Sequence, residues 1–158
     1  MPELCLGTVQ FGMKYGINNQ IGRQPTRDES FEMLDYAIDH GIDTIDTACA
    51  YGEAEEIIGD YVRACGKKHN IKVISKLRPN VIDGRKPAEK IVTEECKNSL
   101  HRLSVEQLDG YLLHTPEYIY QEEVLAALVD LKKEGYVKNI GVSIYDLKEG
   151  CAAIDTGV

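Results

Sequence analysis

Residues 42–55 read IDTIDTACAYGEAE and combine a strand, a loop and the start of a helix. The segment starts as an apolar-alternating strand, passes through a short loop that carries Tyr51, and opens a helix at Glu53. Asp46 ends the strand, and the tyrosine follows five residues later. A strand that leads directly into a helix is the building unit of α/β folds, and both polar side chains can then face one pocket mouth.

Two later strand ends carry further reactive side chains. Lys76 closes the strand segment VISK, and His114 closes YLLH. In a parallel barrel the carboxyl ends of the strands share one face, and active sites lie on that face. We therefore expect Asp46, Tyr51, Lys76 and His114 to meet at one rim.

Strands and helices alternate along the whole chain. The predicted strands are 4–11, 42–46, 71–77, 108–113 and 139–144, with a stub of a sixth at 155–158. Two helices are predicted from Thr26 to just before Gly41 and from Glu53 to just before Gly66. Three more are predicted at 88–103, 122–134 and 146–154. This alternation predicts a parallel sheet with right-handed crossovers, in one domain over residues 1–158.

The order of Asp46, Tyr51, Lys76 and His114 along the chain, and the sequence motifs around them, resemble the aldo-keto reductase family. The matching segments are LGTVQFG (6–12), DTACAYG (46–52), ISKL (74–77), RLSVEQLDGYLLHTP (102–116) and GYVKNIGVS (135–143). The resemblance implies a TIM-barrel (β/α)8 fold, which takes about 250 residues. We expect this chain of 158 residues to form an incomplete barrel of about five parallel β/α units, its N-terminal half.

The resemblance also implies a role for each residue of the group. Tyr51 would donate a proton to a carbonyl oxygen, and the Lys76 ammonium would stabilise the phenolate left behind. Asp46 would anchor the ammonium, and His114 would bind the carbonyl oxygen or relay the proton. Taken alone, each residue has a structural alternative, such as a turn aspartate or a solvated strand-end lysine.

NADPH is the cofactor that the resemblance implies, and a small-molecule carbonyl, such as a sugar-derived one, is the substrate. Ser143, Asp46 and Thr8 match family positions near the nicotinamide. One position departs from the family pattern, because Ile144 stands where asparagine is usual. Little or no binding of NADPH is expected for this chain, since most of the family's cofactor contacts lie beyond the fifth strand.

Composition excludes several other classes of protein. The net charge of −8, with basic residues scattered among the acids, argues against a nucleic-acid or anionic-membrane surface. No apolar run is long enough to span a bilayer, and no signal peptide opens the chain, so a cytoplasmic location is expected. The five cysteines are far apart and form no CxxC, and no cluster has metal-ligand spacing, so we expect neither disulfides nor a metal.

Two hypotheses of function remain open. The first is an NADPH-dependent carbonyl reductase, of which this N-terminal part has little or no activity alone. The second is a non-catalytic half-barrel, a degenerate reductase used as a binding or assembly module. In either case five strands cannot close an eight-stranded barrel, so self-association through exposed sheet edges is expected. The side chains predicted to be exposed to solvent on the barrel-facing side of the sheet are Leu6, Val9, Ile140 and Val142.

Overall fold

Five parallel strands form one sheet whose spatial order is the order of the sequence. The computed structural model describes residues 4–17, 19, 22–65 and 71–158. The strands are β1 (Cys5–Gly7), β2 (Thr44–Asp46), β3 (Lys72–Leu77), β4 (Leu108–Leu113) and β5 (Val137–Val142). Each strand pairs in parallel with the next, which confirms the predicted α/β class.

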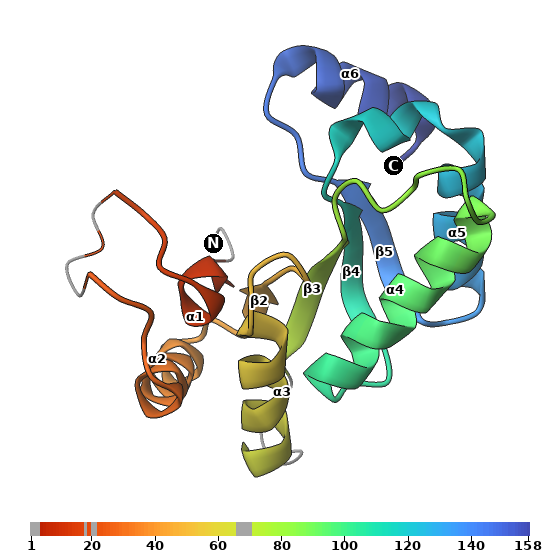
Figure 1. Cartoon of the computed structure of the whole chain (residues 1–158). Coiled ribbons are helices and arrows are strands. Elements are labelled where there is room, and N and C mark those ends of the chain that lie inside the picture. The colour runs from red at the N-terminus through yellow and green to blue at the C-terminus, as the bar shows by residue number, and fades with distance from the viewer. Residues whose placement is uncertain (1–3, 18, 20–21, 66–70) are drawn as a thin grey trace.

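Helices connect the strands, as parallel pairing requires. They are α1 (Val9–Gly12), α2 (Arg27–Asp39), α3 (Ala54–Cys65), α4 (Ala88–Leu103), α5 (Glu122–Lys133) and α6 (Leu147–Thr156), with a 3₁₀ turn, η2, at Pro116–Tyr120. Figure 1 shows α4 and α5 beside β3, β4 and β5, and α6 close to η2 at one end of the sheet. The helix predicted at 88–103 and the strand predicted at 108–113 have the observed bounds.

Local capping explains where several helices begin and end. The Thr26 side chain accepts from the Glu29 N–H at 3.2 Å, and the Glu29 carboxylate accepts from the Thr26 N–H at 2.7 Å. This reciprocal pair is a capping box, and it confirms the predicted start of the helix at Thr26. Gly41 and Gly135, which follow α2 and α5, have φ of +82° and +84°, so the predicted glycine stops are confirmed. The predicted stop at Gly66 lies outside the described residues.

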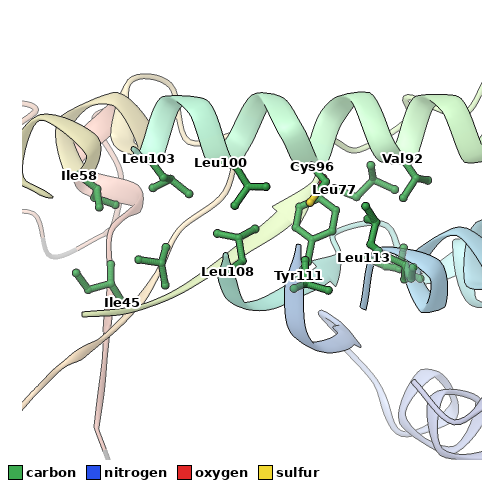
Figure 2. Packing of buried hydrophobic residues seen from close by; sticks show 14 of the residues in the cluster. Ile45, Ile58, Leu77, Val92, Cys96, Leu100, Leu103, Leu108, Tyr111 and Leu113 are labelled. Atoms are coloured by element: carbon green, nitrogen blue, oxygen red, sulfur yellow. The ribbon is translucent and has the colours of Figure 1, made fainter. Parts of the chain in front are cut away.

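The hydrophobic core lies between the helices and one face of the sheet (Figure 2). From α4, four side chains point toward the strands: Val92, Cys96, Leu100 and Leu103. They meet buried strand residues: Ile45, Leu77, Leu108, Tyr111 and Leu113. Because side chains alternate along a strand, Lys76 is directed to the opposite face from Leu77. The packed core therefore occupies one face and leaves the other to polar strand-end groups.

The first strand is shorter than predicted. A strand over residues 4–11 is wrong, because β1 ends at Gly7 and residues Val9–Gly12 form α1. The Phe11 N–H donates to the Thr8 carbonyl at 2.9 Å, which turns the chain, and the Phe11 side chain enters the core from this turn. A short apolar run fits a strand or a buried helical turn equally well, so its periodicity did not discriminate.

The last part of the chain also differs from the prediction. β5 begins at Val137, two residues before the predicted start at Asn139. The predicted sixth-strand stub at 155–158 is wrong, because α6 continues through Thr156 and Gly157 ends it with φ of +78°. The Asp146 capping box starts α6 in a good geometry, and Gly150 does not interrupt the helix.

The side chains predicted to line an uncovered barrel face lie elsewhere. Leu6, Ile140 and Val142 are partly buried against the hydrophobic core, on the helix side of the sheet. Val9 belongs to α1 and not to a strand. The register instead aligns Gly7, Asp46, Ile74, Gly110 and Asn139 across the open face. This row is mostly small or polar. The prediction that Leu6, Val9, Ile140 and Val142 are exposed on the barrel-facing side of the sheet is therefore wrong.

Self-association remains a prediction, and it now depends on the strand edges. β1 and β5 are the outer strands of the sheet, so each has one edge that no described strand pairs with. Unpaired edges promote pairing with another chain. We expect the 158-residue chain to form a dimer or a larger assembly, which static light scattering would detect. A compact monomer at high concentration would contradict this expectation.

Candidate active site

Four side chains predicted to meet at one rim do so. Asp46 is the last residue of β2, and Tyr51 lies in the loop between β2 and α3. Lys76 lies near the end of β3, and His114 directly follows β4. Because neighbouring parallel strands point the same way, their carboxyl ends bring the four groups together.

Lys76 is the centre of this group. Its Nζ donates to Asp46 Oδ1 at 2.6 Å, to the Thr47 carbonyl oxygen at 2.9 Å and to the Tyr51 hydroxyl oxygen at 3.3 Å. The lysine is only 4% exposed. A buried ammonium is tolerated when its protons are satisfied and a counter-charge is close, and these three contacts supply both. The ammonium is therefore held in one place beneath the tyrosine.

The tyrosine ring contacts both the lysine and the histidine. Lys76 Nζ lies 4.9 Å from the centroid of the Tyr51 ring. The Tyr51 and His114 rings meet edge to face, with centroids 5.8 Å apart and planes at 89°. Both contacts are of attractive types, so they restrict the orientation of the phenol.

Two glycines fix the backbone of the tyrosine loop. A Cβ on Gly12 would lie 1.5 Å from the Tyr51 carbonyl oxygen, and one on Gly52 would lie 2.2 Å from the Gly12 carbonyl oxygen. Gly52 also has φ of +56°, which side chains rarely adopt. The Tyr51 carbonyl accepts from the Ala54 N–H at 3.1 Å, which joins the loop to the start of α3. The phenol is thus carried by a backbone with little freedom.

His114 is in an environment that favours the neutral imidazole. Burial lowers its pKa from the ordinary 6.5, the Lys76 ammonium lowers this pKa further, and the Asp46 carboxylate opposes the shift. Its Nδ1 is buried and has no hydrogen-bond partner among the described residues. A neutral ring with the proton on Nε2 avoids burying an unpaired N–H, so Nε2 is the donor that the site can offer.

The lowered pKa of His114 predicts a pH-dependent stability. The unfolded chain binds a proton at this imidazole below about pH 6.5, whereas the folded chain resists it. The free energy of unfolding should therefore fall as the pH drops from about 6.5 toward the folded pKa. Urea titrations across this range should show a steeper fall for the wild type than for His114→Gln.

A matched control for this measurement is His101→Gln. His101 is exposed in the last turn of α4 and is not part of the site. We expect this variant to keep the wild-type slope. Equal slopes for the wild type and His114→Gln would contradict the assignment of the pH dependence to His114.

The residues predicted to contact the cofactor differ in their surroundings. Thr8 is fully buried, and its hydroxyl and N–H both donate to the Asp46 carbonyl, at 2.9 and 3.0 Å. Thr8 therefore positions the end of β2 in this structure. Ser143 directly follows β5, where its N–H donates to the Leu113 carbonyl at 2.9 Å. Ile144, which replaces the usual asparagine, is 47% exposed.

The residues at the rim fit the nicotinamide end of a dinucleotide. Asp46 and Ser143 are partly exposed at strand ends, and the Thr47 hydroxyl is buried without a partner among the described residues. Such polar groups can hold a carboxamide, which both donates and accepts. Cofactor contact by Thr8, Asp46 and Ser143 stays a prediction.

In the described part of the chain, no group of three or more His, Cys, Asp or Glu side chains is arranged to hold a metal ion. None of the described helices has the length and apolarity needed to cross a membrane.

One charged group beside the site was missed from the sequence. Glu55, on α3, is 1% exposed, and its carboxylate accepts from Ser75 on β3 and Arg102 on α4. The sequence motifs predict no role for Glu55. A signal was available in Gly59, one turn later, because its missing side chain lets α3 approach the Arg102 backbone.

Comparison with known proteins points to one family. The model of the aldo/keto reductase family matches residues 3–157. The aldo-keto reductase str7 of Strobilurus tenacellus is 34% identical over 146 residues, which are 90% of this chain and 42% of that protein. The aldo-keto reductase YhdN of Bacillus subtilis is 33% identical over 127 residues, which are 76% of this chain and 38% of that protein.

Solved structures share the fold. An aldo-keto reductase from Klebsiella pneumoniae, solved in complex with NADPH, superposes with a TM-score of 0.71 at 30% identity. The match covers 96% of this chain and 49% of that one. The chain thus corresponds to about half of a TIM-barrel reductase, and it spans less than half the length of the two curated relatives.

Proposed function

The chain belongs to the aldo/keto reductase family, and on that premise we propose that the full-length protein reduces a small aldehyde or ketone with NADPH. One observation carries this proposal: the Tyr51 hydroxyl lies 3.3 Å from a buried lysine that is itself 2.6 Å from Asp46. A phenol beside a fixed ammonium is suited to give up its proton to a nearby oxygen.

Tyr51 is the proton donor in this mechanism. As the carbonyl carbon is reduced, negative charge develops on the carbonyl oxygen, and the phenol transfers its proton there. The phenolate that remains is stabilised by the Lys76 ammonium. Asp46 and the Thr47 carbonyl keep that ammonium in place through the reaction. The cofactor, when bound, supplies the hydride.

His114 would orient the substrate. Its lowered pKa keeps the imidazole neutral near pH 7, and the neutral ring can donate one hydrogen bond from Nε2 to the carbonyl oxygen. The edge-to-face contact makes the two rings neighbours, and in this proposal both donors reach the same carbonyl oxygen. Two preorganised donors stabilise the charge that develops there.

Asp46 and Ser143 would hold the nicotinamide at the ends of β2 and β5. The substrate would be a small carbonyl compound, such as a sugar-derived one, and the protein would act in the cytoplasm. The family relationship supports both the substrate class and the location.

The test is a turnover assay of the full-length protein. NADPH oxidation is followed spectrophotometrically with a panel of aldehydes, ketones and aldoses, beside a control without carbonyl. Consumption that depends on both the protein and the carbonyl is expected. No turnover with any member of a broad panel, by protein shown to bind NADPH, would overturn the proposal.

A further inference from the structure

Behind the site, on the helix side of the sheet, lies a buried charge that the mechanism does not use. The Glu55 carboxylate accepts from the Ser75 hydroxyl at 2.5 Å and from Arg102 Nε at 2.7 Å. Arg102 Nη2 also donates to the Ser99 hydroxyl at 3.2 Å. Glu55, Ser75 and Ser99 are almost completely buried, whereas the Arg102 side chain is 23% exposed. The carboxylate therefore joins α3, β3 and α4.

The position of Glu55 links it to the site through two short paths. On one side, the Ala54 N–H holds the Tyr51 carbonyl at 3.1 Å, and Ala54 immediately precedes Glu55. On the other side, Ser75 immediately precedes Lys76 in β3. Ser75 and Lys76 point to opposite faces because they are consecutive strand residues. The Lys76 ammonium and the Tyr51 hydroxyl then meet at 3.3 Å on the open face, which closes a ring of contacts.

Stability alone does not explain this arrangement. Burying an ion pair costs desolvation energy, and well-packed apolar residues of similar volume often stabilise a protein as well or better. A charged hydrogen-bonded group does impose a more definite geometry than apolar contacts, because its bonds are directional. The geometry that Glu55 defines is the spacing between the first turn of α3, which follows the Tyr51 loop, and β3, which carries Lys76.

We propose that Glu55 is a positioning residue, which keeps the Tyr51 hydroxyl within reach of the Lys76 ammonium by clamping the first turn of α3 to Ser75 and Arg102. The role of this spacing in turnover rests on the proposed function. Loss of the clamp should lengthen the distance between the hydroxyl oxygen and Nζ without altering either side chain.

The experiment compares four variants of the full-length protein. Glu55→Ala removes the clamp, and Ser75→Ala removes its link to β3 while leaving the Glu55–Arg102 pair. Glu55→Gln is the conservative rescue, because its amide can still accept from Arg102 and donate to Ser75. Tyr61→Phe is the matched control: it deletes the 2.5 Å bond from α3 to Asp35 on α2, far from β3 in sequence.

The kinetic readout is the division of the effect between kcat and KM. Glu55→Ala and Ser75→Ala should lower kcat by about tenfold or more, with little change in either KM, because a misplaced acid slows only the chemical step. Glu55→Gln should retain most of the wild-type kcat. Tyr61→Phe should lower the melting temperature and leave kcat close to that of the wild type. Wild-type kcat in folded Ser75→Ala, or an equal loss in Tyr61→Phe, would overturn the proposal.

A structural readout separates this inference from the proposed function. In a crystal structure of Ser75→Ala, the distance from the Tyr51 hydroxyl oxygen to Lys76 Nζ should exceed the hydrogen-bond limit of about 3.5 Å. This variant keeps the buried ion pair, so it can be examined even if Glu55→Ala does not fold. A protein without reductase activity would refute the proposed function alone. An unchanged distance in Ser75→Ala would refute the positioning role whatever the activity.

Discussion

Tyr51→Phe in the full-length protein is expected to lower kcat for carbonyl reduction by roughly 10²–10⁴-fold, the usual contribution of a general acid. The substitution removes only the hydroxyl, which lies 3.3 Å from Lys76 Nζ, and keeps the ring that contacts His114. The substrate oxygen then lacks its proton donor in the transition state. Steady-state kinetics with a carbonyl that the wild type reduces would measure the loss.

NADPH binding provides the internal control for that result. The phenol acts on the carbonyl oxygen and not on the dinucleotide, so the dissociation constant for NADPH should change little. Tyr120→Phe is a matched variant, because Tyr120 is exposed in η2 and is not part of the site. It should retain wild-type kinetics. Turnover at the wild-type rate by Tyr51→Phe would remove Tyr51 from the mechanism.

Much of the rim was predictable because its residues stand at the ends of clear strands. Lys76 and His114 each stand at the end of a predicted strand, and a parallel barrel places such positions on one face. The parallel topology was therefore sufficient to predict that Asp46, Tyr51, Lys76 and His114 lie at one rim. The distances among these groups confirm the gathering, since Lys76 contacts both Asp46 and Tyr51.

Contacts between distant segments could not be predicted in this way. Residues 9–12 form a helical turn because Gly12 packs against the Tyr51 carbonyl, a neighbour that is remote in sequence. Glu55 is buried because Arg102 neutralises it, and Gly59 in α3 indicates only that another backbone comes close, not that it carries this charge. Thr8 has its hydroxyl bonded to the Asp46 carbonyl, which a strand pattern does not show. Tertiary pairing decided each of these cases over local propensity.

The second large effect concerns the cofactor and the 158-residue chain itself. We expect this chain to bind NADPH weakly and to reduce carbonyls poorly or not at all. The chain spans 42% of one curated relative and 49% of a reductase solved with NADPH. In the family that it resembles, the pyrophosphate and adenosine ends of the cofactor are held by residues beyond the fifth strand.

The few groups near the nicotinamide cannot compensate for those contacts. Asp46 already accepts a hydrogen bond from Lys76, and the Thr8 hydroxyl donates to a backbone carbonyl. Ile144 has no side-chain amide, unlike the asparagine that is usual at this position. A few hydrogen bonds at about 1 kcal/mol each do not offset an association cost of about 4–15 kcal/mol. The net charge of −8 also disfavours the approach of an anionic dinucleotide.

Isothermal titration of NADPH into the 158-residue chain, beside the full-length protein, measures this difference. The full-length protein should bind tightly under conditions in which the shorter chain gives no saturable heat. Catalysis should fail for the same reason, because the four rim residues act only when the hydride donor is held within about 3–3.5 Å of the carbonyl carbon. Raising the salt concentration would weaken the long-range repulsion and should not restore tight binding, since the missing contacts are local. A micromolar or tighter dissociation constant for the shorter chain would show that the cofactor is held by the segments around β1 to β5.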